Sequence, residues 1–116
     1  MYNEDELVRI KSIHTKLITI NTIVERHKGI VKALEDIEGQ PAILMLLIAI
    51  AEQFTKLKSK NAKILDEFET DDIRGMISVR NFIAHDYDGI NLAMIESDLR
   101  YNIPKILTII EQLIAK

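Results

Sequence analysis

The chain has no cysteine at all, which excludes disulfide bonds, thiolate metal sites and a cysteine nucleophile. Glycine and proline are also scarce, with 4 and 2 residues among 116. Because turn-forming residues are few and Leu, Ile, Lys, Glu and Ala are many, the composition indicates an all-α protein. The length suits a single domain over residues 1–116.

Long hydrophobic runs are missing too. The longest, from Pro41 to Ala51, covers 11 residues, about half of what a bilayer span needs. The first ten residues are acidic and polar, unlike a secretory signal. Together with the lack of cysteine, these features predict a cytoplasmic protein without a membrane partner.

Excess positive charge is absent as well, since the formal net charge is -3. Proteins that hold nucleic acid by bulk charge are usually basic. A nucleic-acid function would therefore need a local positive site. Lys56, Lys58, Lys60 and Lys63 form a basic strip that is either a solvated face or a contact for RNA or a protein partner.

The apolar periodicity predicts an antiparallel bundle of about five helices. Asn3 is expected to cap the first helix, Pro41 to begin the third, and Pro104 to kink or restart the last helical stretch. The apolar third helix is expected to be buried on every side, by the bundle or by a second subunit. The helical ranges are residues 3–28, 30–37, from 41 onward, 62–69, 71–84, 91–102 and from 104 to the end.

An arginine interrupts the apolar row of the helix expected over residues 71–84. The row would comprise positions 73, 76, 77, 80 and 84, and position 80 is arginine. A guanidinium group stays protonated, so placing it in an apolar row is costly unless it is paired. Asn81 and His85 are four residues apart and share the neighbouring face, and Tyr87 follows in a turn.

These side chains suit phosphodiester chemistry. Arginine can hold a phosphate with two hydrogen bonds, and histidine exchanges protons near neutral pH. RNA supplies its own nucleophile, the 2′-hydroxyl, so that cleavage needs no metal and no cofactor. A structural interpretation stays open: Arg80 would pair with a buried acid such as Glu52, His85 would cap the helix, and Tyr87 would be a core residue with its hydroxyl at the surface.

The segment from Arg80 to Tyr87, RNFIAHDY, resembles the Arg-x4-His-x-Tyr motif of HepT-like toxins within the HEPN superfamily. Ile50–Gln53 is similar to the family's Ile-Gly-Glu-Ala segment, and residues 102–106 to its proline followed by a helix. Ile73, Ser78 and Ala51 replace residues common in the family, which marks a divergent member.

The resemblance implies a helical homodimer that cleaves RNA without metal, with two motifs meeting at the interface. Arg80 would bind the phosphate, His85 would transfer protons, Asn81 would orient one of them, and Glu52 would position Arg80. The resemblance also implies a nucleotidyltransferase antitoxin of the MNT type that adenylylates Tyr87.

Two other functions remain open: a non-catalytic subunit that binds nucleotide or substrate for a nucleotidyltransferase, and a purely structural dimerisation module. His14 is expected to be partly buried or a dimer contact, and His27 to lie on the surface. The three histidines share no metal-ligand spacing, so no metal site is expected.

Overall fold

The computed structural model describes residues 2–115, and this part of the chain is all-α, without strands. A 3-10 turn and a π-helical turn accompany the α-helices, and α5, the π turn and α6 follow one another without a break. The expected helical bundle is therefore confirmed. Its elements are α1 (Glu4–Arg26), α2 (Ile30–Glu35), α3 (Gly39–Ser59), η1 (Lys63–Glu67), α4 (Thr70–His85), α5 (Leu92–Ser97), η2 (Asp98–Asn102) and α6 (Ile103–Ala115).

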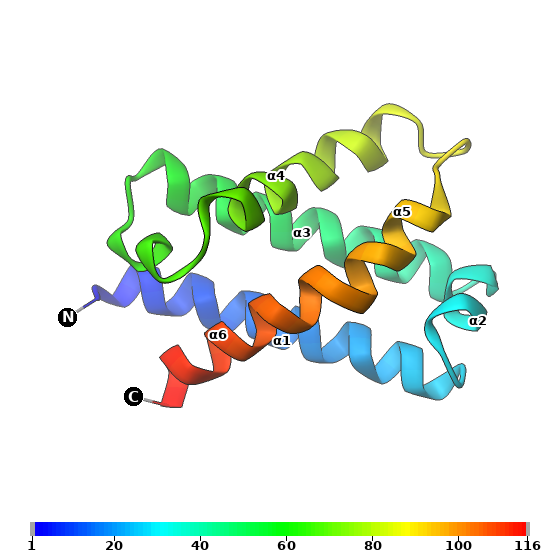
Figure 1. Cartoon of the computed structure of the whole chain (residues 1–116), viewed down its shortest axis with the longest axis horizontal. Coiled ribbons are helices and arrows are strands. Elements are labelled where there is room, and N and C mark those ends of the chain that lie inside the picture. The colour runs from blue at the N-terminus through cyan, green and yellow to red at the C-terminus, as the bar shows by residue number, and fades with distance from the viewer. Residues whose placement is uncertain (1, 116) are drawn as a thin grey trace.

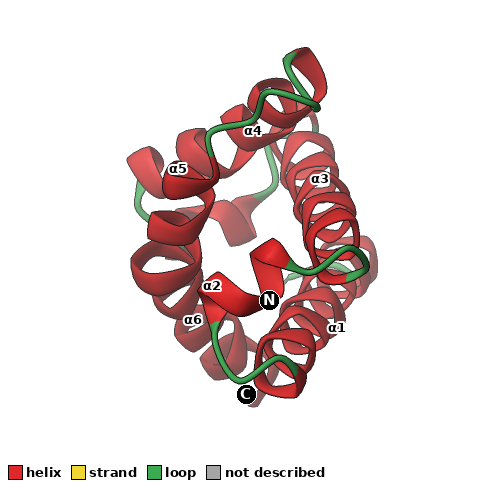
Figure 2. Ribbon diagram, turned by 90° about the vertical axis from the view of Figure 1, so that its right-hand side faces the viewer, coloured by secondary structure: helices red, strands yellow, loops and turns green. Residues whose placement is uncertain are grey.

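The long helices pack around one apolar core. α3 lies between α1 and α4 and runs antiparallel to both, and α6 packs along α1 (Figure 1). The end-on view in Figure 2 shows the helices surrounding the centre of the molecule. The expected cap of α1 is present, since Asn3 Oδ1 accepts the Glu6 N–H at 2.8 Å. The core side chains of α1 are Ile10, Ile13, Leu17, Ile20 and Ile23.

The corner between α2 and α3 differs from expectation. α3 begins at Gly39, two residues before Pro41, and α2 ends at Glu35. The reason is the Asp36 carboxylate, whose Oδ2 accepts the N–H groups of Glu38 at 2.9 Å and Gly39 at 2.8 Å. These bonds satisfy donors that a helix start leaves free. Ile37 is consequently 89% exposed outside any helix.

The last helical stretch restarts as α6 next to Pro104, one of the two outcomes expected there. Proline has no N–H, so the carbonyl four residues earlier loses its usual helical donor. The chain adopts a π turn over Asp98–Asn102, in which the Ile103 N–H bonds the Asp98 carbonyl. A π turn inserts one extra residue into a helix and lets α5 and α6 continue as one stretch.

The bundle does not bury α3 on every side. Leu44, Leu47 and Ile50 are inaccessible or nearly so, whereas Met45 is 64% exposed. The side chain of Met45 therefore faces away from the rest of this chain. None of the helices within residues 2–115 is both long and apolar enough to cross a membrane.

Candidate active site

The buried face of α4 is rotated by about one residue from the expected row. Its buried side chains are Ile73, Met76, Val79 and Ile83. Arg80 is exposed, so the expectation that it interrupts a buried apolar stripe is wrong. Burying Val79 in its place removes apolar surface from water without desolvating a guanidinium. The rotation leaves Arg80 facing solvent.

The motif residues lie at the open end of α4. The helix ends at His85, and every residue from Ala84 to Gly89 is exposed. Arg80 Nη1 lies 3.5 Å from Asn81 Oδ1, a long and weak hydrogen bond. Tyr87 is 45% exposed, which contradicts the alternative that it belongs to the core.

A pocket of about 710 Å³ opens at this end of α4. Arg80, Asn81 and His85 all line it, so the structure brings these three expected site residues together. Tyr87 is not among its lining residues. All of its lining residues come from α4 and from the loop that leads into α5. The remaining lining residues are Phe82, Ala84, Asp86, Gly89, Ile90 and Asn91.

A second hollow, of about 350 Å³, adjoins the same arginine on the side of α3. It is lined by Glu52, Thr55, Lys56, Ile77, Arg80 and Asn81. Glu52 thus shares a hollow with Arg80, but it is exposed, and no ion pair within residues 2–115 joins the two. The alternative in which Arg80 pairs with a buried Glu52 is wrong.

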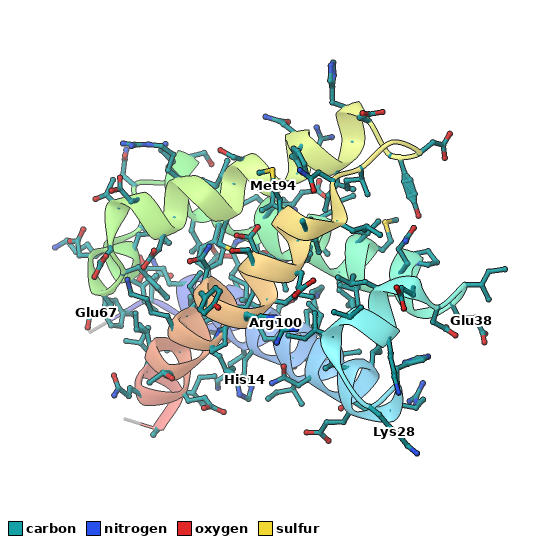
Figure 3. All side chains as sticks on the ribbon, turned by 45° about the vertical axis from the view of Figure 1, so that its right-hand side comes forward. His14, Lys28, Glu38, Glu67, Met94 and Arg100 are labelled. Carbon is teal, nitrogen blue, oxygen red and sulfur yellow. The ribbon has the colours of Figure 1, made fainter. Side chains whose placement is uncertain are left out.

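The three histidines have different surroundings. His14 Nε2 lies 3.4 Å from Glu111 Oε2, and Figure 3 shows His14 beside α6, away from α4. His27 Nδ1 is 2.8 Å from the Ile23 carbonyl oxygen, and its Nε2 is 3.1 Å from Asp36 Oδ2. His27 is therefore half-buried and bonded, not a plain surface residue. His85 has no side-chain hydrogen bond or ion pair within residues 2–115.

The basic strip divides into separate environments. Lys56 lines the hollow beside Arg80, whereas Lys58 lines a different one near η1 and the start of α4. Lys60 Nζ pairs with Asp5 at 3.1 Å. Of these three lysines, Lys56 is the one that lines a hollow together with Arg80 and adds to the positive charge there.

The arrangement provides an anion-binding group and a proton-transfer group at one pocket. A guanidinium can bind a phosphodiester and stabilise added negative charge, and an imidazole can exchange the proton. Within residues 2–115, no group of three or more His, Asp or Glu side chains is gathered to hold a metal ion. These groups suit acid–base chemistry on a phosphate ester.

Residues 11–113 match a family model described as ribonuclease HepT-like. The chain belongs to the HepT-like ribonuclease family. The match includes the segment Arg80–Tyr87 and thus all of the motif that the resemblance rested on. Searches of curated proteins and of solved structures gave no match. For this HepT-like chain, the expected family and the expected helical fold are both confirmed.

The sequence predicted Asn91 as a helix cap, which the structure confirms, but it did not place Phe82, Ile90 or Asn91 in the site. Phe82 and Ile90 are half-buried, and all three line the pocket of this HepT-like chain beside His85. Phe82 lies inside the motif segment, which was the only signal for it. Ile90 and Asn91 reach the pocket through the path of the loop after α4, which no residue pattern specifies.

Proposed function

We propose that this chain is a toxin-type, metal-independent endoribonuclease in which Arg80 and His85 act on the scissile phosphodiester. One observation carries the proposal: Arg80, Asn81 and His85 line one pocket, and nothing within residues 2–115 bonds the His85 side chain. A histidine that is free of structural bonds is available for proton transfer. Membership of the HepT-like ribonuclease family supports the substrate class.

In the proposed reaction, the 2′-hydroxyl oxygen of RNA attacks the adjacent phosphorus. Its proton passes to a neutral imidazole, the P–O5′ bond breaks, and the departing 5′ oxygen takes a proton from an imidazolium. The products are a 2′,3′-cyclic phosphate and a 5′-hydroxyl. Arg80 binds the phosphate and stabilises the charge that develops on it, while Asn81 orients the phosphate or His85. Glu52 acts from the adjoining hollow as a positioning residue for Arg80.

The need for two proton-transfer groups supports a homodimer with two motifs at its interface. His85 is the only histidine that lines either hollow. Met45 lies two turns from Glu52 on the same face of α3, about 10 Å along the helix axis. Because α3 and α4 are antiparallel (Figure 1), this exposed apolar residue lies alongside the His85 end of α4. A second copy that covers Met45 would bring its own His85 nearby.

Cleavage of RNA in EDTA tests the catalytic proposal. We expect Arg80→Ala and His85→Ala each to lower the rate by about 100-fold or more. Arg74 is an exposed arginine on the same helix, so Arg74→Ala is the matched control, and His14→Ala serves likewise for His85. Both controls should retain the wild-type rate. Full activity in the Arg80 and His85 variants would overturn the proposal, and RNA binding without cleavage by the wild type would favour the non-catalytic subunit.

The exposure of Tyr87 supports its proposed adenylylation by an MNT-type nucleotidyltransferase antitoxin. Tyr87 is 45% exposed in the loop that follows His85, where a transferase can reach it. Mass spectrometry after co-expression with such an antitoxin should find AMP on Tyr87. Tyr87→Phe should abolish the modification, whereas Tyr101→Phe, at a 70% exposed position, should not. An unmodified but fully inhibited protein would contradict this model.

A further inference from the structure

Arg80 and Asn81 line both hollows, so they form the divide between them. A phosphate bound to Arg80 therefore lies next to both hollows. The hollow beside His85 has about twice the volume of the one beside Lys56, about 710 Å³ against about 350 Å³. The two sides also differ in chemistry, which suggests that they hold different parts of the strand.

The larger pocket combines an aromatic ring, an aliphatic wall and a free amide. Phe82 and Ile90 are half-buried and line it. Asn91 Oδ1 accepts the Ala93 N–H at 3.0 Å, which leaves Nδ2 without a partner within residues 2–115. Aromatic rings stack on bases of any identity, and an amide N–H₂ can donate to a base edge. This pocket suits a nucleobase.

The smaller hollow has a cation and a hydroxyl at its surface. Lys56 has no ion pair within residues 2–115, and the exposed Thr55 and Glu52 lie in the same lining. Thr55 Oγ1 donates to the Ala51 carbonyl at 3.0 Å, so Lys56 is the group available to an anion. With Arg80 and Glu52 counted, two cations face one carboxylate. This hollow suits a backbone phosphate better than a base.

We propose that the two hollows set the register of the RNA strand. The base next to the scissile phosphate enters the pocket of Phe82 and Asn91, and the phosphate one nucleotide beyond, on the other side of Arg80, binds Lys56. This register rests on the proposed ribonuclease function, because it takes Arg80 as the ligand of the scissile phosphate. Phe82 and Asn91 are the specificity-determining residues, and Lys56 binds the flanking phosphate.

Abasic substitution tests the base pocket. The probe is a 5′-fluorescein RNA of 12 nucleotides and mixed sequence, whose cut site is located first with wild-type protein. Binding is then measured in EDTA with the same oligomer carrying a single 2′-deoxy nucleotide at that site. Removing the base on one side of the cut should raise Kd by roughly tenfold, the loss of one base–aromatic stack. Removing the base on the other side should have less effect.

A double-mutant comparison assigns that base to Phe82. Phe82→Leu keeps an apolar side chain for packing but removes the ring. In this variant, the same abasic substitution should raise Kd little further, because the ring and the base belong to one interaction that the mutation has already removed. Asn91→Ser keeps a good helix cap and should change the preference among the four bases at that position. Fully additive losses with Phe82→Leu and an unchanged base preference with Asn91→Ser would overturn the base pocket.

Lys56→Gln tests the flanking phosphate, with Lys58→Gln as a charge-matched control on the same helix. Binding of the 12-mer should weaken with salt less steeply in Lys56→Gln, by about 0.7 in the slope of log K against log salt. Lys58→Gln should keep the wild-type slope. Equal slopes in the two variants would overturn the role of Lys56. Absence of cleavage by wild-type protein would instead contradict the proposed function, and the slopes would still decide whether Lys56 holds a phosphate.

Discussion

Two helix ends in this molecule carry a histidine, and they differ in how the side chain is held. At the end of α1, His27 bonds the Ile23 carbonyl and pairs with Asp36, whose carboxylate also caps the start of α3. Figure 3 shows Lys28, next to His27, and Glu38 at the same end of the molecule. At the end of α4, His85 has no comparable bond within residues 2–115, and it lines the pocket of about 710 Å³.

This difference assigns His27 to the stability of the fold and leaves His85 available to whatever binds in the pocket. The bonds of His27 join three helices at one corner, so its removal should affect folding. His85 contributes no bond of this kind, so its removal should leave the fold intact and affect only what binds in the pocket. Both histidines lie at the C-terminal end of a helix, and the bonds of His27 to Ile23 and Asp36 make the distinction.

The largest expected effect is that one histidine variant loses activity without losing stability, while the other loses stability without losing activity. His85→Ala should lower RNA cleavage by about 100-fold or more and leave Tm unchanged. His27→Ala should lower stability by about 1 kcal/mol through lost hydrogen bonds and leave the cleavage rate of the folded protein unchanged. Thermal melts and single-turnover rates on both variants provide the check. Loss of stability in His85→Ala equal to that in His27→Ala would break the comparison.

Two glycines compare how tightly the chain is packed at these two places, Gly39 at the start of α3 and Gly89 in the loop after α4. A Cβ on Gly39 would lie 2.4 Å from the Ala33 carbonyl oxygen, so α2 and α3 would have to move apart. A Cβ on Gly89 would lie 2.8 Å from the Asp86 carboxylate, a side chain that can rotate away. Gly39→Ala should therefore cost about 1–3 kcal/mol in urea unfolding, and Gly89→Ala much less. Equal losses would show that the loop after α4 is as tightly packed as the α2–α3 corner.

The hydrogen bonds of the Asp36 carboxylate, between α2 and α3, should make the stability of the fold depend on pH. The backbone N–H of Gly39, that of Glu38 and the nearby His27 lower the pKa of Asp36 below its usual 3.8. A depressed carboxyl pKa stabilises the folded state above the usual value, and this contribution is lost as pH falls through the folded-state value. Asp36→Ala should thus destabilise the protein at pH 7 and have a smaller effect near pH 3. A gap between wild type and variant that is the same at both pH values would contradict the assignment.

The smallest expected effect lies in the π turn. Burial raises the pKa of Asp98, and the hydrogen bond from Asn102 opposes this only in part. Ionised Asp98 therefore weakens the folded state once pH exceeds the raised pKa. Asp98→Asn keeps an oxygen to accept from Asn102, and it should raise Tm slightly at pH 7. A lower Tm at that pH would mean that the charge itself stabilises the turn.

The sequence predicted the fold well because its helical periodicity is strong. The apolar stripe of α1, the Asn3 cap and the change of helix type next to Pro104 all depend on local chemistry. The start of α3 was missed because the Asp36 cap competes with Pro41 for the helix start. The face of α4 was misassigned because positions 79 and 80 are adjacent, and only packing against α3 decides which is buried.

The candidate site could be predicted only in part. The resemblance identified Arg80, Asn81 and His85, which the structure brings to one pocket. The pocket is also lined by the loop between α4 and α5. Ile90 and Asn91 belong to this loop, so their place in the pocket could not be inferred from periodicity. Lys56 was one of several equivalent lysines in the sequence, and tertiary packing alone distinguishes it from Lys58 and Lys60.

The most direct measurement is cleavage, in EDTA, of two matched RNA oligomers that differ by one 2′-deoxy nucleotide at the cut site. The proposed chemistry predicts that the all-ribose oligomer is cut to a 2′,3′-cyclic phosphate and a 5′-hydroxyl, and that the deoxy oligomer stays intact. Equal cutting of both oligomers, or cutting only after a divalent metal is added, would contradict a site in which Arg80, His85 and the RNA's own hydroxyl suffice.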